Sequence, residues 1–310
     1  MQDTPLGGFA NGAERITTVR LPGDKRYTSG LKNTAATNRF YSIDGHPDGA
    51  DVFEKALSVL ERDAASVLRV IDGGAWPLWV EQREMLCTFM AVQYLRGPDH
   101  RRTLEYLAAQ MTRLEVKFTG REKVKQWVQE RYGVEVDDDE AEVLWQQATK
   151  PSGPPINIAP IAHIEQIIDG AGELLPYIIS RRWKLVRFER RSLVTSDSPV
   201  ALVPAEHAEP WQGVGFATAW RITFPLSRKL GLIMSKGYPV EKVRAGHLDS
   251  VEPGTTKTEK FINASTVSSA SEYVYHHPDD EGFLPFPLPE PNLTNIAGPE
   301  QFWPESSDRL

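Results

Sequence analysis

The sequence predicts an α+β protein in which a central bundle of about five to six helices packs on a mostly antiparallel sheet. Two observations predict this class. Apolar residues recur every three or four positions between residues 51 and 180, and they alternate with polar residues between 183 and 235. Strands and helices are therefore segregated along the chain and do not alternate as in a doubly wound parallel sheet. We expect the N-terminal hairpin and the later strands to share one sheet.

The first elements are short strands. Segments 16–21 and 25–30 flank Pro22-Gly23-Asp24, which is typical of a hairpin, and 38–43 (NRFYSI) is a third strand candidate. Helices are then expected at about 51–71, 79–96, 99–116 and 119–133, from 137 onwards, and at 160–180. The helix at 79–96 is apolar on nearly every face, which predicts that it is the central, buried helix.

The period then changes from helical to alternating. Four strands are expected within 183–196, 199–204, 217–227 and 229–235, followed by a last helix at about 257–275. A Pro-rich tail from 278 to the end carries four aromatic residues, and we expect it to be clamped to the body: Phe283, Phe286, Phe302 and Trp303.

Length and composition predict one domain. The chain has 310 residues, 40% of them hydrophobic, which suffices for a sizeable core. We expect a single α+β domain over 1–310, made of a hairpin and helical half (13–149), a segment of helix, strands and last helix (156–277) and the tail (278–310). The segment 150–155 (KPSGPP) is the clearest linker.

Charge and cysteine content narrow the function classes. The net charge of −7 disfavours general attraction to nucleic acid or acidic membranes. The single cysteine, Cys87, excludes an internal disulfide and fits a reducing cytoplasm. No apolar run approaches the ~20 residues that span a bilayer, and the first twelve residues lack the features of a signal peptide. The prediction is a cytoplasmic protein without a membrane partner.

Standard motifs do not assign a cofactor. The sequence lacks the glycine-rich phosphate loops, the zinc patterns and the GxSxG nucleophile elbow. The segment 44–51 (DGHPDGAD) is rich in possible metal ligands but lacks the order of an EF-hand. His276 and His277 are expected to cap the last helix, and His163 is expected to be a core residue.

Three observations point to a site. Gln93 lies in the apolar helix at 79–96, with Arg96 one turn later on the same face. Glu54 and Glu61 are seven residues apart on the first helix, close to two turns, so that both carboxylates face the same way. The polar segment 195–199 (TSDSP) ends a strand, and Asp197 there can project from the sheet end.

These segments favour a cytoplasmic, carboxylate-dependent hydrolase, of which a metal-assisted nuclease is a narrower form. Asp197 and Glu61 would share a divalent metal ion or act as a general acid/base pair. Arg96 would steady an anion, and Gln93 would orient a substrate or a water molecule. The substrate would be a small molecule or a nucleic acid, and the sequence does not predict an oligomeric state.

Two alternatives stay open. In the first, the protein is a non-catalytic binding or interaction protein, in which Arg96 pairs with Glu61 to tie two helices together and Asp197 shapes a turn. In the second, the basic cluster at 181–191, which interleaves arginines with Trp183 and Phe188, binds a nucleic-acid single strand. Neither face of that strand is purely basic, which favours a solvated strand instead.

The chain also resembles a bacterial and phage family catalogued as domain of unknown function 4238. The resemblance rests on an ordered set of segments that spans most of the chain: NRFYSI, VFEKALSVLERDAASVL, AVQYLRGPDHRR, SLVTSDSPVALVP, ITFPLSRKLGLIM and INASTVSSASEYVY. It implies a single domain with no agreed activity. It also implies that the residues at the family's motif positions form the site: Glu61, Gln93, Arg96, Ser196, Asp197, Pro225 and Asn263. Among the candidates, we expect Ser196, Asn263 and Glu54 to bind rather than react.

One departure from the family concerns the N-terminus. Family members usually open with His-x-x-Pro, an aromatic residue and Leu-Arg, whereas here only 5–12 (PLGGFANG) resembles the end of that segment. The chain therefore begins downstream of the usual start or has lost the segment. If the family's histidine is catalytic, this chain is expected to be inactive.

Overall fold

A computed structural model describes residues 5–34, 51–209, 213–237 and 248–292. The chain folds as two compact units. The main unit comprises Met1–Asp99 and Pro160–Leu310, and the helical unit comprises His100–Ala159. The α+β class is confirmed by the helices and two mostly antiparallel sheets. The single domain over 1–310 stays a prediction, because two compact units can belong to one domain.

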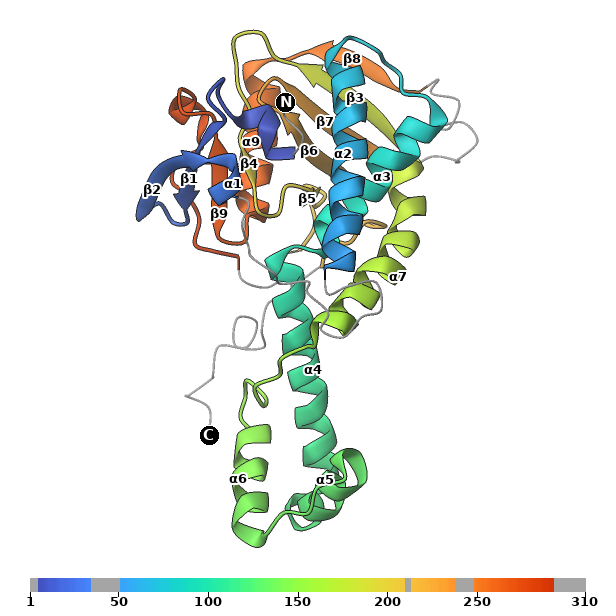
Figure 1. The fold of residues 1–310 in the computed structure, drawn as a ribbon, viewed down its shortest axis with the longest axis vertical. Helices are drawn as coiled ribbons and strands as arrows, with labels where there is room; N and C mark the ends of the chain where they lie inside the picture. Colours follow the sequence, from blue (N-terminus) through green and yellow to red (C-terminus); the bar gives the residue numbers. More distant parts are fainter. Residues whose placement is uncertain (1–4, 35–50, 210–212, 238–247, 293–310) are drawn as a thin grey trace. The chain divides into compact units, whose positions relative to one another are not determined.

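The larger sheet lies in the main unit and has the order β5-β6-β7-β3-β8. Its strands are β3 (Arg181–Arg187), β5 (Ala201–Val203), β6 (Arg221–Ser227), β7 (Leu230–Gly237) and β8 (Ser250–Pro253). Neighbouring strands are antiparallel except β3 and β8, which pair in parallel. Figure 1 shows α2 (Val52–Asp72), α3 (Val80–Leu95) and α7 (Pro160–Ile179) together beside this sheet. These helices confirm those predicted at 51–71, 79–96 and 160–180.

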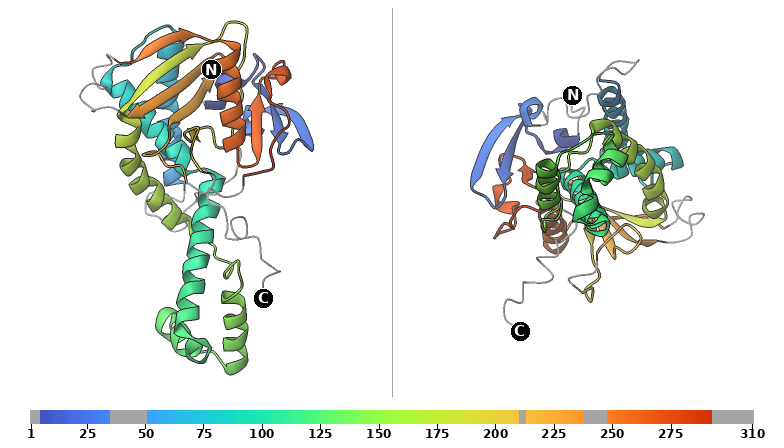
Figure 2. Two further views of the ribbon diagram at one scale, coloured as in Figure 1. Left: turned by 180° about the vertical axis from the view of Figure 1, so that it is seen from behind. Right: turned by 90° about the horizontal axis from the view of Figure 1, so that it is seen from below.

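The smaller sheet, with the order β2-β1-β9-β4, corrects the expectation of one shared sheet. The hairpin of β1 (Arg15–Arg20) and β2 (Lys25–Gly30) does pair with later strands, but only with β9 (Tyr273–His276) and, through it, β4 (Thr195–Ser196). Figure 2 shows this second sheet beside α9 (Thr256–Ser269). The strand expected over 183–196 is thus two strands in two different sheets.

The last helix also ends earlier than the expected 275. α9 ends at Ser269, and the residues after the connection form β9. This strand pairs with β1, so that Tyr273 lies opposite Arg20 and His276 lies opposite Thr17. The residues of β9 alternate between buried and half-buried positions, as in a strand, although their spacing would also permit a helix. The strand is favoured because its backbone pairs with the edge of β1, which would otherwise be unpaired. His276 and His277 therefore do not cap a helix.

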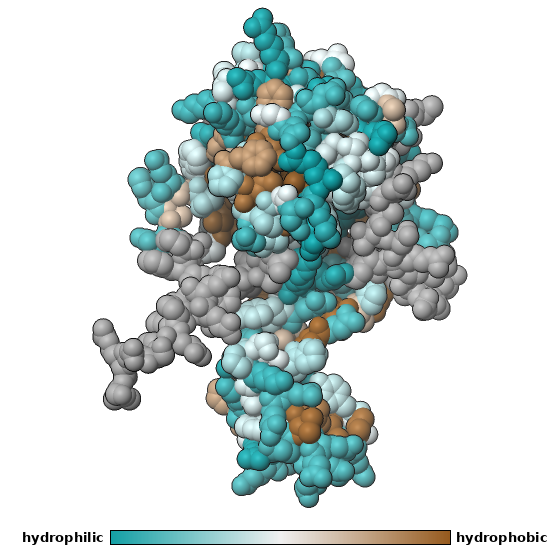
Figure 3. Space-filling model, turned by 90° about the vertical axis from the view of Figure 1, so that its left-hand side faces the viewer, coloured by the Kyte–Doolittle hydropathy of each residue, from teal (hydrophilic) through white to brown (hydrophobic). Residues whose placement is uncertain are grey.

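The helical unit contains most of α4 (Pro98–Thr119), the short η2 (Arg121–Lys123), α5 (Val124–Tyr132) and α6 (Asp138–Ala148). These helices confirm the predictions at 99–116, 119–133 and from 137 onwards. Asp137 caps α6 by accepting from the amide of Glu140 at 2.8 Å. A small core holds the unit together: Val116, Val124, Val128, Ala141 and Ala148. Figure 3 shows that hydrophobic side chains also reach the surface of this unit.

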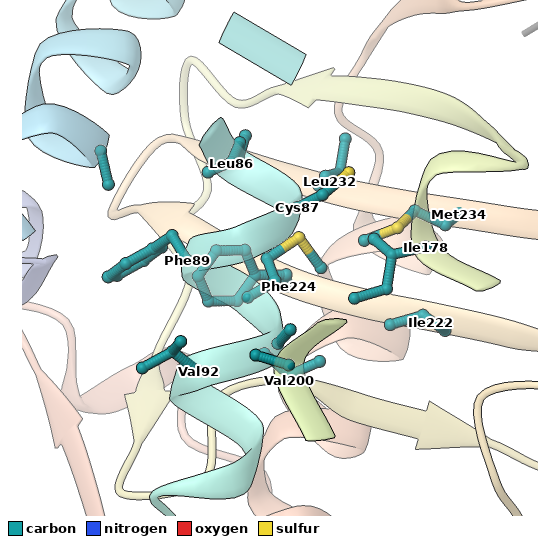
Figure 4. Close-up of a cluster of buried hydrophobic side chains, with 14 of the residues drawn as sticks. Leu86, Cys87, Phe89, Val92, Ile178, Val200, Ile222, Phe224, Leu232 and Met234 are labelled. Carbon is teal, nitrogen blue, oxygen red and sulfur yellow. The ribbon is translucent and has the colours of Figure 1, made fainter. Parts of the chain in front are cut away.

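The main core lies between α3 and the larger sheet (Figure 4). Leu86, Cys87 and Phe89 of α3 face strand residues such as Phe224 and Leu232, and all five are almost fully buried. The rings of Phe89 and Phe224 are 6.2 Å apart, within the range of favourable aromatic pairs. The prediction that this helix is the central, buried one is therefore confirmed. Burial raises the pKa of the Cys87 thiol to about 12.

The tail is described as far as residue 292. Leu284 and Leu288 are buried in a cluster with residues of β1 and α9, so this part is packed against the main unit, as expected. Phe286 is exposed. The strand expected at 38–43, most of the segment 44–51, and Phe302 and Trp303 lie outside the described residues. None of the described helices combines the length and apolarity needed to cross a membrane.

Candidate functional site

The junction between α3 and α4 brings two predicted segments together. Arg96 ends α3, Pro98 begins α4, and Gly97 lies between them. A Cβ atom at Gly97 would collide with Oδ1 of Asp99 and lie 3.3 Å from Oγ of Ser198. The absence of a side chain at Gly97 therefore lets the polar segment 195–199 approach the junction closely.

Glu61 and Arg96 form an ion pair across α2 and α3. Nη1 of Arg96 lies 2.8 Å from Oε1 of Glu61, and the two side chains remain 27% and 22% exposed. The sequence offered this contact as the structural alternative to catalysis, in which the pair ties two helices together. Gln93, one turn earlier on α3, is buried. Glu54 lies in the first turn of α2 and is half-buried; Oγ of Ser58 donates to its backbone carbonyl at 2.9 Å.

Asp197 is occupied by backbone amides. Its Oδ1 accepts from the amide of Ser271 at 2.8 Å, and its Oδ2 accepts from those of Glu272 at 2.8 Å and Tyr273 at 3.0 Å. The carboxylate thus fixes the connection between α9 and β9, as a turn-shaping aspartate would. Burial raises its pKa to about 6, the negative charge of Asp99 adds to the rise, and the three amides oppose it.

A second carboxylate, which sequence reasoning missed, lies beside Asp197. Asp99 is buried in the first turn of α4, and its Oδ1 accepts from Oγ of Ser198 at 2.8 Å. Ser196 is buried and accepts from the amide of Ser198 at 3.2 Å, so its hydroxyl shapes the same turn. The sequence contains one signal for Asp99: an acidic residue directly after Gly-Pro is suited to the first turn of a helix.

Asn263 on α9 is a buried link between three segments. Its Oδ1 accepts from the amide of Val194 at 3.0 Å, and its Nδ2 donates to Glu259, to the carbonyl of Ser192 at 3.1 Å and to that of Phe283 at 3.0 Å. These contacts use both ends of the amide. The structure gives Asn263 a framework role, and the ligand-binding role that we expected stays a prediction.

The predicted metal ligands lack a third partner in the described structure. Glu61 pairs with Arg96, and Asp197 binds three amides. Within residues 5–34, 51–209, 213–237 and 248–292, no three His, Cys, Asp or Glu side chains are grouped so that they could hold a metal ion. The structure therefore does not bring Asp197 and Glu61 together in a recognisable metal centre.

The basic cluster at 181–191 is largely tied into the fold. Trp183 and Phe188 are buried, so neither ring is available at the surface to stack on a base. Arg181 is also buried and donates to backbone carbonyls, including those of Ser235 at 2.8 Å and Phe216 at 2.6 Å. Arg191 pairs with Glu259 at 3.3 Å. The aromatic platform that a single-strand binder requires is therefore missing here.

Comparison with known families agrees with the resemblance predicted from the ordered segments. A family model described as "Protein of unknown function (DUF4238)" matches residues 5–280, which is nearly the whole chain. No curated protein and no solved structure matches. The description assigns no activity to the family.

Proposed function

This chain belongs to the DUF4238 family, and from that premise we propose that it is a non-catalytic binding protein whose helical unit docks a partner. One observation carries the proposal. Four large apolar side chains, Leu107, Met111, Leu114 and Phe118, are 40%, 64%, 53% and 88% exposed along α4. We call these four residues the α4 stripe. Exposed apolar side chains that gather on one face are typical of interaction sites.

The spacing of the α4 stripe supports docking of another helix or an apolar surface. The residues are four, three and four positions apart, which is the spacing of the apolar seam of a coiled coil. Ala109 and Val116, near the opposite face of α4, are buried within the helical unit. The helix therefore has one apolar face for its own core and a second that the helical unit leaves uncovered.

The polar residues support the same proposal. Glu61 and Arg96 join two helices, Asp197 holds three amides and Asn263 links three segments. Each of these contacts joins segments of the fold, and none requires a substrate. The proposal retains the cytoplasmic location predicted from the single cysteine.

Site-specific photocrosslinking in cells of the source organism tests the proposal. A photoreactive phenylalanine analogue replaces Met111, and a control chain carries it at Ile168, which is 60% exposed on α7 of the main unit. The proposal expects a discrete crosslinked species from position 111 and none from position 168. Equal labelling at the two positions, or no product at position 111, would contradict it.

One specific observation favours a second candidate, the carboxylate-dependent hydrolase. Asp197, whose pKa burial raises to about 6, has Asp99 as a charged neighbour, and a carboxyl group whose pKa is raised toward neutral suits general acid/base catalysis. In this candidate Asp197 carries the proton, and Arg96, which pairs with Glu61, is the neighbour of Gly97 in the chain. A metal-assisted nuclease is its narrower form.

The hydrolase candidate is tested with generic substrates. Wild type and Asp197→Asn are compared on p-nitrophenyl esters, p-nitrophenyl phosphate and single-stranded DNA, each with and without Mg²⁺ or Mn²⁺. The candidate expects turnover that is lost in Asp197→Asn although the circular dichroism spectrum is retained. Turnover that survives the substitution would remove Asp197 from the chemistry.

A further inference from the structure

We infer that the partner of the α4 stripe is a second copy of this chain, an inference that rests on the proposed function. The two helices would meet along Leu107, Met111, Leu114 and Phe118 of each copy. A seam of this spacing is self-complementary, because the same apolar ridge fits the holes of an identical helix. A two-fold contact of this kind is closed and yields a dimer rather than a filament.

Charge makes a second copy a suitable occupant. The helical unit carries nine Lys and Arg residues and ten Asp and Glu residues, a net charge of −1, whereas the whole chain carries −7. Two helical units can therefore approach each other with little long-range repulsion, and no large excess of one sign recruits an oppositely charged partner.

The residues beside the α4 stripe are also compatible with self-association. Glu115 is neutralised within its own unit by Arg131, 3.1 Å away. In an antiparallel pair of α4 helices, Leu107 faces Phe118 of the other copy and Met111 faces Leu114. Lys117 then lies near Gln110 of the other copy, so no like charges meet across the seam.

The exposed area of the α4 stripe sets the expected affinity of the dimer. Its four side chains expose on the order of 500 Å² per copy, so that two copies reach the roughly 1,000 Å² at the lower limit for a specific interface. Phe118, which is 88% exposed, supplies the largest single share. The expected dimer is therefore reversible and depends on concentration in the micromolar range.

The test is sedimentation velocity of the whole chain across a range from below one to several hundred micromolar. We expect wild type to shift from monomer to dimer. Met111→Glu at the centre of the seam should raise the dissociation constant at least about tenfold, because it places a charge in an apolar contact. Ile168→Glu, on equally exposed surface outside the seam, should leave it unchanged. Thermal melts of both variants verify that each is folded.

Two results would overturn the inference. The first is a wild-type chain that stays monomeric over the whole range. The second is a dimer that Met111→Glu leaves unchanged, because the contact would then lie elsewhere. The proposed function fails separately: a monomer that crosslinks a different protein from position 111 excludes the second copy yet supports docking, whereas no crosslink at all contradicts the proposed function.

Discussion

Oγ of Ser198 donates a hydrogen bond to Oδ1 of Asp99 over 2.8 Å, and this contact joins the strand-ending segment 195–199 to the first turn of α4. The bond is buried, and Asp99 lies close enough to Asp197 to raise the pKa of that carboxyl. Two acidic groups are thus held at one junction, each satisfied by neighbours in the fold.

Asp197→Ala should lower the free energy of unfolding by about 2–4 kcal/mol, because three amides lose their acceptor in a partly buried turn. Urea denaturation followed by tryptophan fluorescence measures the change. The exposed Asp169 on α7 provides a matched control, and Asp169→Ala should change stability by less than about 0.5 kcal/mol. Equal effects at the two positions would show that the amide contacts contribute little.

The pKa of Asp197 predicts a pH dependence of stability. Its folded-state pKa is about 6, above the ordinary value of 3.8, so the native state binds the proton more tightly than the unfolded state does. This group therefore contributes stability that is present below about pH 4 and is lost as the pH rises through 6. The loss attributable to Asp197 should be on the order of 3 kcal/mol.

Urea denaturation of wild type and Asp197→Asn at intervals between pH 4 and pH 7 measures this contribution as a difference. Because the other groups titrate alike in both proteins, the stability of wild type relative to the variant should fall across the window. A constant difference between the two proteins would mean that Asp197 titrates near its ordinary value.

The ion pair of Glu61 and Arg96 should contribute little to stability, because both side chains remain about a quarter exposed. A double-mutant cycle with Glu61→Gln and Arg96→Gln should give a coupling energy of about 0.5–1 kcal/mol, weakened by added salt. A coupling near zero would mean that the pair is not populated in solution. If either substitution abolished turnover of the generic substrates while changing stability this little, the result would instead favour the hydrolase candidate.

Asn263→Ala should be among the most damaging single substitutions in the main unit. It leaves the amide of Val194 and the carbonyls of Ser192 and Phe283 without their partner in a buried setting, at a cost of about 3–5 kcal/mol. Thermal unfolding measures the effect. Asn157→Ala, at an exposed position, is the control and should melt close to wild type. A small effect at Asn263 would mean that water replaces the lost contacts.

The sequence by itself determined the local elements. The stripe that begins at Phe53 and Leu57 predicts α2, and the nearly continuous apolar character of 85–95 predicts a buried α3. These predictions succeeded because helical periodicity depends on near neighbours in the chain. The same local information identified Glu61, Arg96 and Asp197 as unusual residues, but it could not state which contacts satisfy them.

Only the tertiary structure decided how distant segments pair. β1 selects β9 as its neighbour across more than 250 residues, which turns the end of a predicted helix into a strand and divides one expected sheet into two. Likewise, only the tertiary structure shows that Asp197 accepts hydrogen bonds from the amides of residues 271–273. It also identifies Asp99 as part of the same junction, through its hydrogen bond from Ser198. The physical reason is that pairing and burial depend on which surfaces meet in space, and chain-local patterns do not encode that choice.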